Sequence, residues 1–227
     1  MRGPCRKRPE PSGRRRLLLY SHRPHTPFAH GLNASGKTRQ GTEALREAYA
    51  LGLVFPLRNG TYYVAHGGNS PVINYHNVDG THRYALGIAR LGPYRTRAAG
   101  LYPRDPGAYA IFDDRLYSPC DGTVTHAVDG LPNLVPPESD REHPAGNHII
   151  LECDDYPGVK IVMAHLMNGS VAVKPGRRVR AGETIGRVGN SGSSTEPHLH
   201  IHAAKGGDPA SPLDGAGVPI TFGGGSW

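Results

Sequence analysis

The sequence predicts an all-β protein, a compact antiparallel sheet or barrel made of short strands. The 227-residue chain holds 31 glycines and 21 prolines, a composition that favours turns over long helices. Short apolar–polar alternations recur between glycine-containing turns at intervals of about 6–10 residues. A chain of this length holds one substantial core plus an extension. We therefore expect a tail over residues 1–41 and a single β-rich domain over residues 42–227.

The positive charge belongs to the tail. Residues 1–40 contain ten Lys and Arg residues and one acid, Glu10, a net charge of +9, so the total of +7 leaves about −2 for the rest. Clustered arginines and prolines without apolar periodicity predict disorder. We expect no specific nucleic-acid binding by the body, although the tail could contact nucleic acid or a membrane surface. Leu17–Tyr20 is too short for a secretory signal, and we find no transmembrane segment.

One motif in the tail matches the phosphate-binding loop. Gly31–Thr38 fits G-x-x-x-x-G-K-[ST], a pattern that binds phosphate only between a buried strand and a helix. The preceding residues, Arg23–Pro27, contain two prolines and cannot form a central strand. We therefore do not expect nucleotide binding.

The expected elements begin with one short helix. Thr42–Leu51 has a threonine N-cap and is followed by Gly52. Asn59-Gly60 predicts a hairpin between strands at Leu53–Arg58 and Thr61–Val64. Further strands are predicted at Pro71–Tyr75, Arg83–Leu91, Ala110–Phe112, Leu116–Pro119, Gly122–Val128, Asn147–Cys153 and Lys160–Leu166.

The segment that carries most chemistry reads His-Leu-His-Ile-His, from His198 to His202. In a strand, the three imidazoles share one face while Leu199 and Ile201 share the other. The apolar pair would anchor the strand and leave imidazoles in a groove, suited to one metal ligand and one catalytic group. The alternative is a half-buried strand whose polar face is histidine. His165 at a strand end, and His76 and His82 around a polar turn, are further candidates for a shared metal site.

Two of the three cysteines, Cys120 and Cys153, lie beside predicted strands. They could form a disulfide in an oxidising compartment or remain two buried thiols. The sequence contains neither C-x-x-C nor H-E-x-x-H, which excludes the common finger and helical zinc sites.

Tyr117–Ala203 resembles the lysostaphin-type zinc endopeptidases, which cut peptides of bacterial peptidoglycan. The motifs that carry the resemblance are, in order, Ser118–Val124, Gly146–Ile150, Ala164–Leu166, Val179–Gly186, Gly189–Gly192 and Ser194–His200. With upstream motifs similar to a bacterial subgroup, the resemblance extends over about residues 53–222. It implies a barrel-sandwich hybrid with a catalytic core over about residues 110–205, peptidoglycan peptides as substrate, and a location outside the cell or in the cell envelope.

The resemblance also implies residue roles. His200 would be a ligand of a single Zn²⁺, and His165 and His198 would be the catalytic pair. His76 would be a second metal ligand, with His82 as its rival. An aspartate ligand is expected after Ala85-Leu86, where this sequence has Gly87.

This departure leaves three outcomes open. Asp79, His82 or a further acidic residue could substitute as ligand, or the site could hold zinc loosely. The third outcome is a degenerate domain that serves as a cell-wall-binding or regulatory module. The spacing of valines and glycines over Val171–Gly189 also resembles biotinyl and lipoyl carrier barrels, but the context of Lys174 does not match a carrier lysine, so we interpret this as shared architecture.

Overall fold

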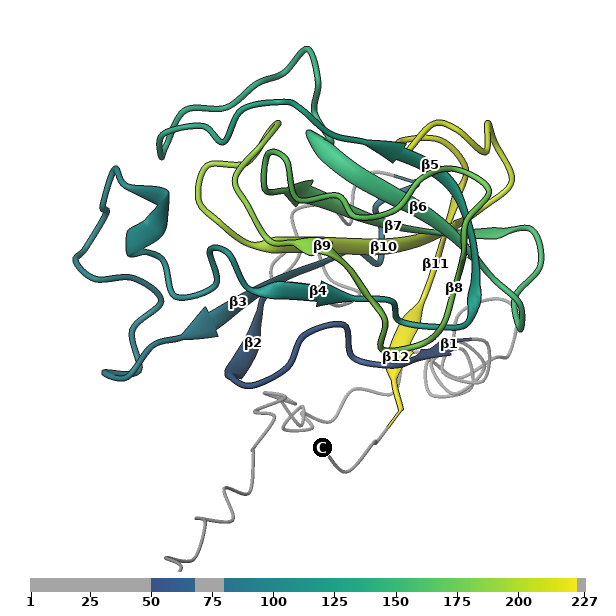
Figure 1. The fold of residues 1–227 in the computed structure, drawn as a ribbon, viewed down its shortest axis with the longest axis horizontal. Helices are drawn as coiled ribbons and strands as arrows, with labels where there is room; N and C mark the ends of the chain where they lie inside the picture. The colour runs from purple at the N-terminus through teal and green to yellow at the C-terminus, as the bar shows by residue number, and fades with distance from the viewer. Residues whose placement is uncertain (1–49, 68–79, 224–227) are drawn as a thin grey trace, which may run out of the picture.

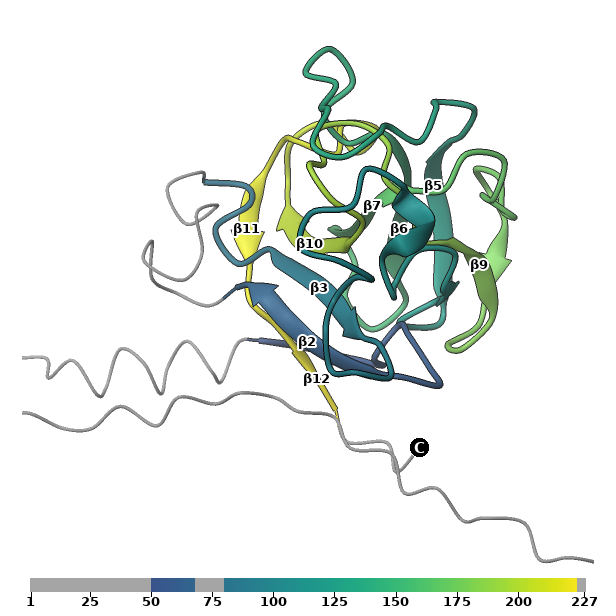
Figure 2. The ribbon, with the colours of Figure 1, turned by 90° about the vertical axis from the view of Figure 1, so that its left-hand side faces the viewer.

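The structure, a computed structural model, describes residues 50–67 and 80–223. Within these residues the fold is all-β, as predicted, and the helical element is a single 3₁₀ turn, η2 (Pro106–Ala108). Figures 1 and 2 show the strands wrapped into one body with β6, β7 and β10 side by side at its centre.

The main sheet has eight strands. Seven follow one path, and β11 (Ala216–Val218) pairs with β10 beside it. In spatial order the seven are β2 (Thr61–His66), β3 (Leu86–Leu91), β10 (Leu199–Lys205), β7 (Val159–Leu166), β6 (Asn147–Cys153), β5 (Gly122–Val128) and β8 (Arg178–Val179). Two small sheets flank it: β1 (Leu51–Leu53) runs parallel to β12 (Ile220–Phe222), and β4 (Arg115–Tyr117) runs antiparallel to β9 (Thr184–Arg187).

The hydrophobic core covers one face of the central strands. Ile149 pairs with Met163, and Ile201 pairs with Met163 on the other side, and all three are fully buried in one apolar cluster. Side chains alternate between faces along each strand. The neighbouring residues, such as Ala164 opposite His200, therefore lie on the other face. The core thus fixes which face of β10 is available for chemistry.

Several predicted strands agree closely with the structure. Gly122–Val128 and Asn147–Cys153 match β5 and β6, and the strand predicted at Lys160–Leu166 is β7 with one residue added. Pro71–Tyr75, the tail and most of the predicted helix lie outside the described residues.

Three predictions were wrong. Leu51, predicted to end a helix, begins β1, where its carbonyl and amide face the C-terminal strand β12. The Asn59-Gly60 turn does not join a hairpin, because β1 pairs with β12 and β2 pairs with β3. Asn59 does adopt a positive φ of 66°. Ala110–Phe112 forms a turn, with the amide of Phe112 donating to the carbonyl of Tyr109 at 3.0 Å.

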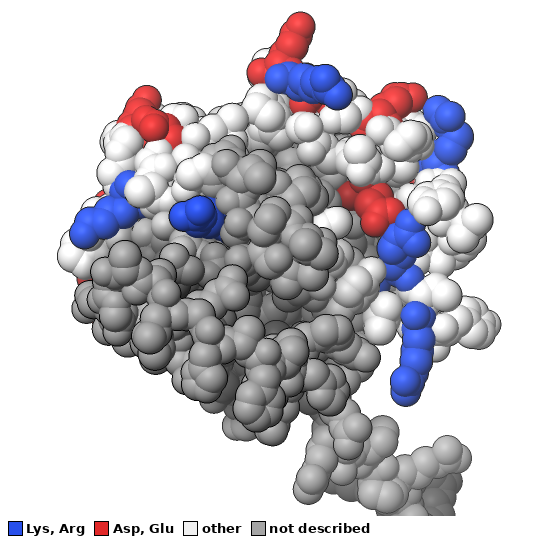
Figure 3. Space-filling model, turned by 180° about the vertical axis from the view of Figure 1, so that it is seen from behind, with Lys and Arg blue, Asp and Glu red and all other residues white. Residues whose placement is uncertain are grey.

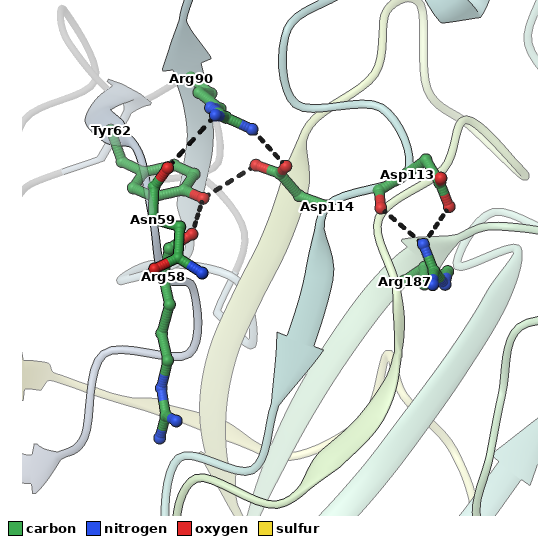
Figure 4. Close-up of polar contacts among 7 residues, drawn as sticks. All are labelled: Arg58, Asn59, Tyr62, Arg90, Asp113, Asp114 and Arg187. Carbon is green, nitrogen blue, oxygen red and sulfur yellow. Dashed lines mark hydrogen bonds and ion pairs between the residues drawn. The ribbon is translucent and has the colours of Figure 1, made fainter. Parts of the chain in front are cut away.

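A polar network attaches the β2–β3 pair to the rest of the body (Figure 4). The Tyr62 hydroxyl lies 2.9 Å from Asp114 Oδ2 and 2.8 Å from the Arg58 carbonyl, and the Arg90 guanidinium pairs with Asp114 at 2.5 Å. Burial raises the pKa of both Tyr62 and Asp114. Asp113, the neighbour of Asp114 in the chain, pairs with Arg187 of β9 at 2.7 Å.

The open choice between a disulfide and two thiols is resolved in favour of the disulfide. Cys120 and Cys153 are bonded across 33 residues, joining the turn before β5 to the end of β6. On the face drawn in Figure 3, acidic and basic side chains are interspersed over the described part of the surface. None of the described helices is long and apolar enough to cross a membrane.

Candidate active site

A cleft of about 470 Å³ lies on the face of the sheet opposite the core. Six histidines of the described chain line it: His66, His82, His165, His198, His200 and His202. One ring nitrogen from each of His165, His198 and His200 lies within 4.8 Å of the other two. The structure thus brings together three of the four residues singled out as site residues. The fourth, His76, lies outside the described residues, as does Asp79.

Strand β10 presents its histidines as the alternation predicts. Leu199 and Ile201 are fully buried in the core, while His200 and His202 face the cleft beside Ala164 and Val162 of β7. His200 is 5% exposed and His202 is 1% exposed, so both imidazoles sit in a largely dry environment.

His165 is held by its backbone and by one ring nitrogen. Its φ of 62° is uncommon for a residue other than glycine, a conformation that persists where the surroundings impose it. Its Nδ1 lies 2.9 Å from the carbonyl oxygen of Ser191. A carbonyl only accepts, so Nδ1 donates and Nε2 carries the lone pair. The buried Ser191 is fixed in turn, because its hydroxyl donates to the Leu166 carbonyl at 2.7 Å and accepts from the Asn147 amide at 2.9 Å.

His198 is oriented in the same way. Its Nδ1 donates to the carbonyl of Glu196 at 2.9 Å and lies 3.2 Å from the Ser194 hydroxyl, which leaves the lone pair on Nε2. Burial lowers the pKa of His198, the Glu196 carbonyl opposes this shift, and His66 adds a smaller lowering. The ring centroids of His165 and His198 are 4.9 Å apart. In the neutral rings, Nε2 is therefore the acceptor atom of both imidazoles.

A second group of histidines shares His200. One ring nitrogen from each of His82, His200 and His202 lies within 4.8 Å of the others. His202 Nε2 donates to the Pro212 carbonyl at 3.1 Å, so its lone pair lies on Nδ1, 3.0 Å from His200 Nε2. The sequence placed His202 on this face without giving it a role.

Gly87 lies at the centre of the amino-terminal side of the cleft. It pairs with His200 of β10 on one side and with His66 of β2 on the other. A Cβ at this position would lie 3.5 Å from Cδ2 of His198 and 3.6 Å from Cβ of His66. A carboxylate here would therefore reach the histidine cluster, as the resemblance predicts, but glycine supplies no ligand.

His66 could not be found from periodicity. Val64 pairs with the core residue Ile88, and strict alternation would place His66 on the core side as well. A register shift between Val64 and His66 pairs His66 with Gly87 instead. Such irregularities change the direction of side chains. Periodicity along β2 would therefore assign His66 to the wrong face.

A second feature that the sequence did not reveal lies at the rim. Arg97 Nε donates to both carboxylate oxygens of Glu196, at 3.0 and 2.9 Å. This pair ties the segment before β4 to the residues that orient His198. Its partners are separated by 99 residues, so only the folded chain brings them together.

The donor set suits a metal ion. Imidazole nitrogens are common ligands of zinc, and neutral histidines fixed by backbone carbonyls are typical of such centres. The chemistry of the cleft residues thus fits zinc, although Gly87 removes the one expected anionic ligand.

Comparisons with known proteins found similar sequences and structures. Residues 110–212 match the sequence model of "Peptidase family M23". The peptidoglycan DD-endopeptidase ShyA of Vibrio cholerae is 33% identical over 81 residues, which is 35% of this chain and 18% of that protein. The DD-carboxypeptidase/endopeptidase Mpg of Neisseria meningitidis is 46% identical over 56 residues, 25% of this chain and 12% of that protein.

The matched stretches thus span 18% or less of these curated relatives. Among solved structures, the M23 metalloprotease pseudoalterin from the deep sea aligns over 70% of this chain and 73% of its own, with 17% identity and a TM-score of 0.41.

Proposed function

Because residues 110–212 form a domain of peptidase family M23, we propose that the protein is a zinc-dependent endopeptidase that hydrolyses peptide bonds of bacterial peptidoglycan. The observation that carries the proposal is the convergence of His165, His198 and His200 within 4.8 Å in one cleft. No packing requirement explains why three imidazoles from two separate strand ends meet there. The rings of His165 and His198 are each fixed by a backbone carbonyl.

In this proposal, His200 holds the metal. The resemblance predicts His76 as a second ligand, and residue 87 contributes none. When bound, zinc supplies a Lewis acid that polarises a carbonyl and makes a water molecule acidic near neutral pH.

His165 and His198 then handle the water and the developing charge. Both Nδ1 atoms donate to carbonyls, so in the neutral rings Nε2 is the atom that can accept a proton. One imidazole accepts the proton of the attacking water, and the protonated ring donates a hydrogen bond to the oxyanion or returns the proton to the leaving amine. No covalent intermediate with the enzyme is needed.

The floor of the cleft suits a peptide with small side chains. Ala65, Ala89, Ala145 and Ala164 line it beside Gly87. Short side chains let an extended backbone approach the histidines closely, which favours the alanine- and glycine-rich peptides of peptidoglycan as substrate. We propose the cell envelope or the exterior as the place of action, where that substrate is found.

The test is digestion of purified peptidoglycan followed by mass spectrometry of the released peptides. We expect cleaved peptides from the zinc-loaded protein, and none after chelation or from His165→Ala or His198→Ala. His126→Ala serves as the matched control, because His126 does not line the cleft. Products that persist in the two cleft variants would contradict the proposal.

A second candidate is a domain that binds the cell wall without cutting it. Gly87 favours this candidate, because it removes the expected carboxylate. Sedimentation of the protein with intact sacculi, with no peptide released at any zinc concentration, would support binding alone.

A further inference from the structure

We propose that this chain holds its metal with three imidazoles, those of His82, His200 and His202. This set replaces the two histidines and one aspartate that the resemblance predicts. The inference deepens the proposed function and takes from it only the identity of the metal.

The carboxylate expected at residue 87 is missing. Gly87 is the cross-strand partner of His200, so a side chain at 87 would lie next to that ligand. Catalytic zinc sites keep three protein ligands. Because Gly87 has no side chain, the chain must supply another donor near His200 if it is to bind zinc tightly.

The rings of His82, His200 and His202 also lie close together. One nitrogen from each of the three rings lies within 4.8 Å of the others. His200 Nε2 and His202 Nδ1 are 3.0 Å apart. In the structure this contact is a hydrogen bond, so zinc would have to replace the proton of His200 Nε2. Two nitrogens bound at 2.0–2.1 Å to a tetrahedral zinc are separated by roughly 3.3 Å, so the exchange requires little movement of the two rings. The His82 ring stands at 86° to His200 and 89° to His202, with centroids 5.5 and 4.7 Å away.

His202 is already in the tautomer that a ligand needs. Its Nε2 donates to the Pro212 carbonyl, which leaves the Nδ1 lone pair on the side of His200. Metal-ligating histidines usually donate their other N–H to a carbonyl or carboxylate in this way. Pro212 itself sits in a segment held by Lys160, whose Nζ donates to the carbonyls of Asp208 and Ser211 at 2.7 and 2.6 Å.

The same C-terminal segment fixes the turn that carries His82. The Thr81 hydroxyl donates to the Gly215 carbonyl at 2.7 Å, and the Gly217 amide donates to the Gly80 carbonyl at 2.9 Å. His82 and His202, far apart in the chain, are thus positioned by one segment, residues 206–217. This arrangement gives the triad a preorganised support independent of residue 87.

The rival explanation is that His202 only positions His200. In a metal-free site the His200 N–H would donate to His202 Nδ1, and His202 would act through that hydrogen bond. Removing an outer partner of this kind costs about 10–100-fold in metal affinity, whereas removing a direct ligand costs more. His82 makes the sharper test, since it is partly exposed and its replacement disturbs little packing.

The experiment is a Zn²⁺ titration of the full chain against a chromophoric chelator, with Co²⁺ absorption spectra as a second readout. Variants are His82→Gln, His202→Gln, His66→Gln and His76→Gln, with metal-free thermal unfolding to check folding. We expect one zinc per wild-type chain. His82→Gln should lose more than about 100-fold in affinity and change the Co²⁺ spectrum, while His66→Gln and His76→Gln should stay within a few-fold of wild type.

Unchanged affinity in a folded His82→Gln, or a loss confined to His76→Gln or His66→Gln, would overturn the proposal. The titration is separate from peptidoglycan digestion. Zinc bound through the triad without any digestion would leave this inference standing and remove the proposed function. Digestion by a protein whose zinc affinity does not depend on His82 would support the proposed function and overturn this inference.

Discussion

The two sides of the cleft are built differently. On the carboxyl-terminal side, His165 and His198 are each anchored by a carbonyl from the segment that joins β9 to β10, and both present the same nitrogen. On the amino-terminal side, Gly87 stands where an aspartate is expected, and His66 and His82 come from segments outside the central strands. In our proposal, the groups that handle water are in place, while the carboxylate expected at residue 87 is absent.

This contrast follows from what each side is attached to. The carboxyl-terminal groups depend on buried contacts, such as Ser191 beneath His165, whose loss would leave buried polar atoms unpaired. A side chain at residue 87 of β3 would project into the cleft and contribute little to packing. The metal side can therefore change its donors without disturbing the fold, and the first prediction separates the two sides.

The largest effect is expected from His198→Ala. Loss of a general acid–base group lowers the rate of peptide hydrolysis by about 10²–10⁴-fold. Zinc affinity should stay within a few-fold, because His198 acts on water rather than on the metal. Rate measurements on peptidoglycan fragments and a parallel zinc titration check this. A variant that loses zinc together with activity would show that the two sides are not separate.

The disulfide should matter for stability and not for the cleft. Replacing Cys120 and Cys153 together by alanine removes a cross-link across 33 residues. Such a loss typically lowers the free energy of unfolding by about 2–4 kcal/mol. Urea denaturation measures the change, and zinc affinity of the folded variant should equal that of the wild type. A large drop in zinc affinity would link the disulfide to the metal side, contrary to our description.

Restoring the carboxylate sharpens the comparison from the other direction. Gly87→Asp places an anionic donor about one side chain from His198 and His66, with no close contact to prevent it. We expect zinc affinity to rise at least about tenfold, or about 1.4 kcal/mol. Gly87→Asn, of similar size and without charge, is the matched control. An equal gain from both variants would show that charge is not what the site lacks.

The smallest effect concerns a buried histidine outside the cleft. His148 Nδ1 donates to the Gly146 carbonyl at 2.7 Å, and burial lowers the pKa of His148 below its ordinary value of 6.5. As pH falls below about 6.5, the unfolded chain binds a proton that the folded chain resists, so stability falls until the folded pKa is passed.

His148→Leu removes this contribution. Its stability should decline less steeply below pH 6.5 than that of the wild type, as measured by urea denaturation at several pH values. Parallel curves for the two proteins would assign the acid sensitivity to other groups, the cleft histidines among them.

The sequence predicted most of the central sheet because short apolar runs bounded by turn residues mark its strands. It also predicted that His165, His198 and His200 meet, through motifs whose order resembles a known family. It did not predict the partner of β1, since pairing with the C-terminal strand depends on contacts across the whole chain. The sequence did not predict that His66 faces the cleft, because a local register shift within β2 changes the direction of its side chain.

The most direct measurement is the anomalous scattering of zinc in a crystal of the metal-loaded protein. The account predicts one peak in the histidine cleft at about 2.0–2.1 Å from a ring nitrogen of His200, with His165 and His198 facing the ion across a water molecule. A peak elsewhere, or no peak in the cleft at saturating zinc, would contradict it.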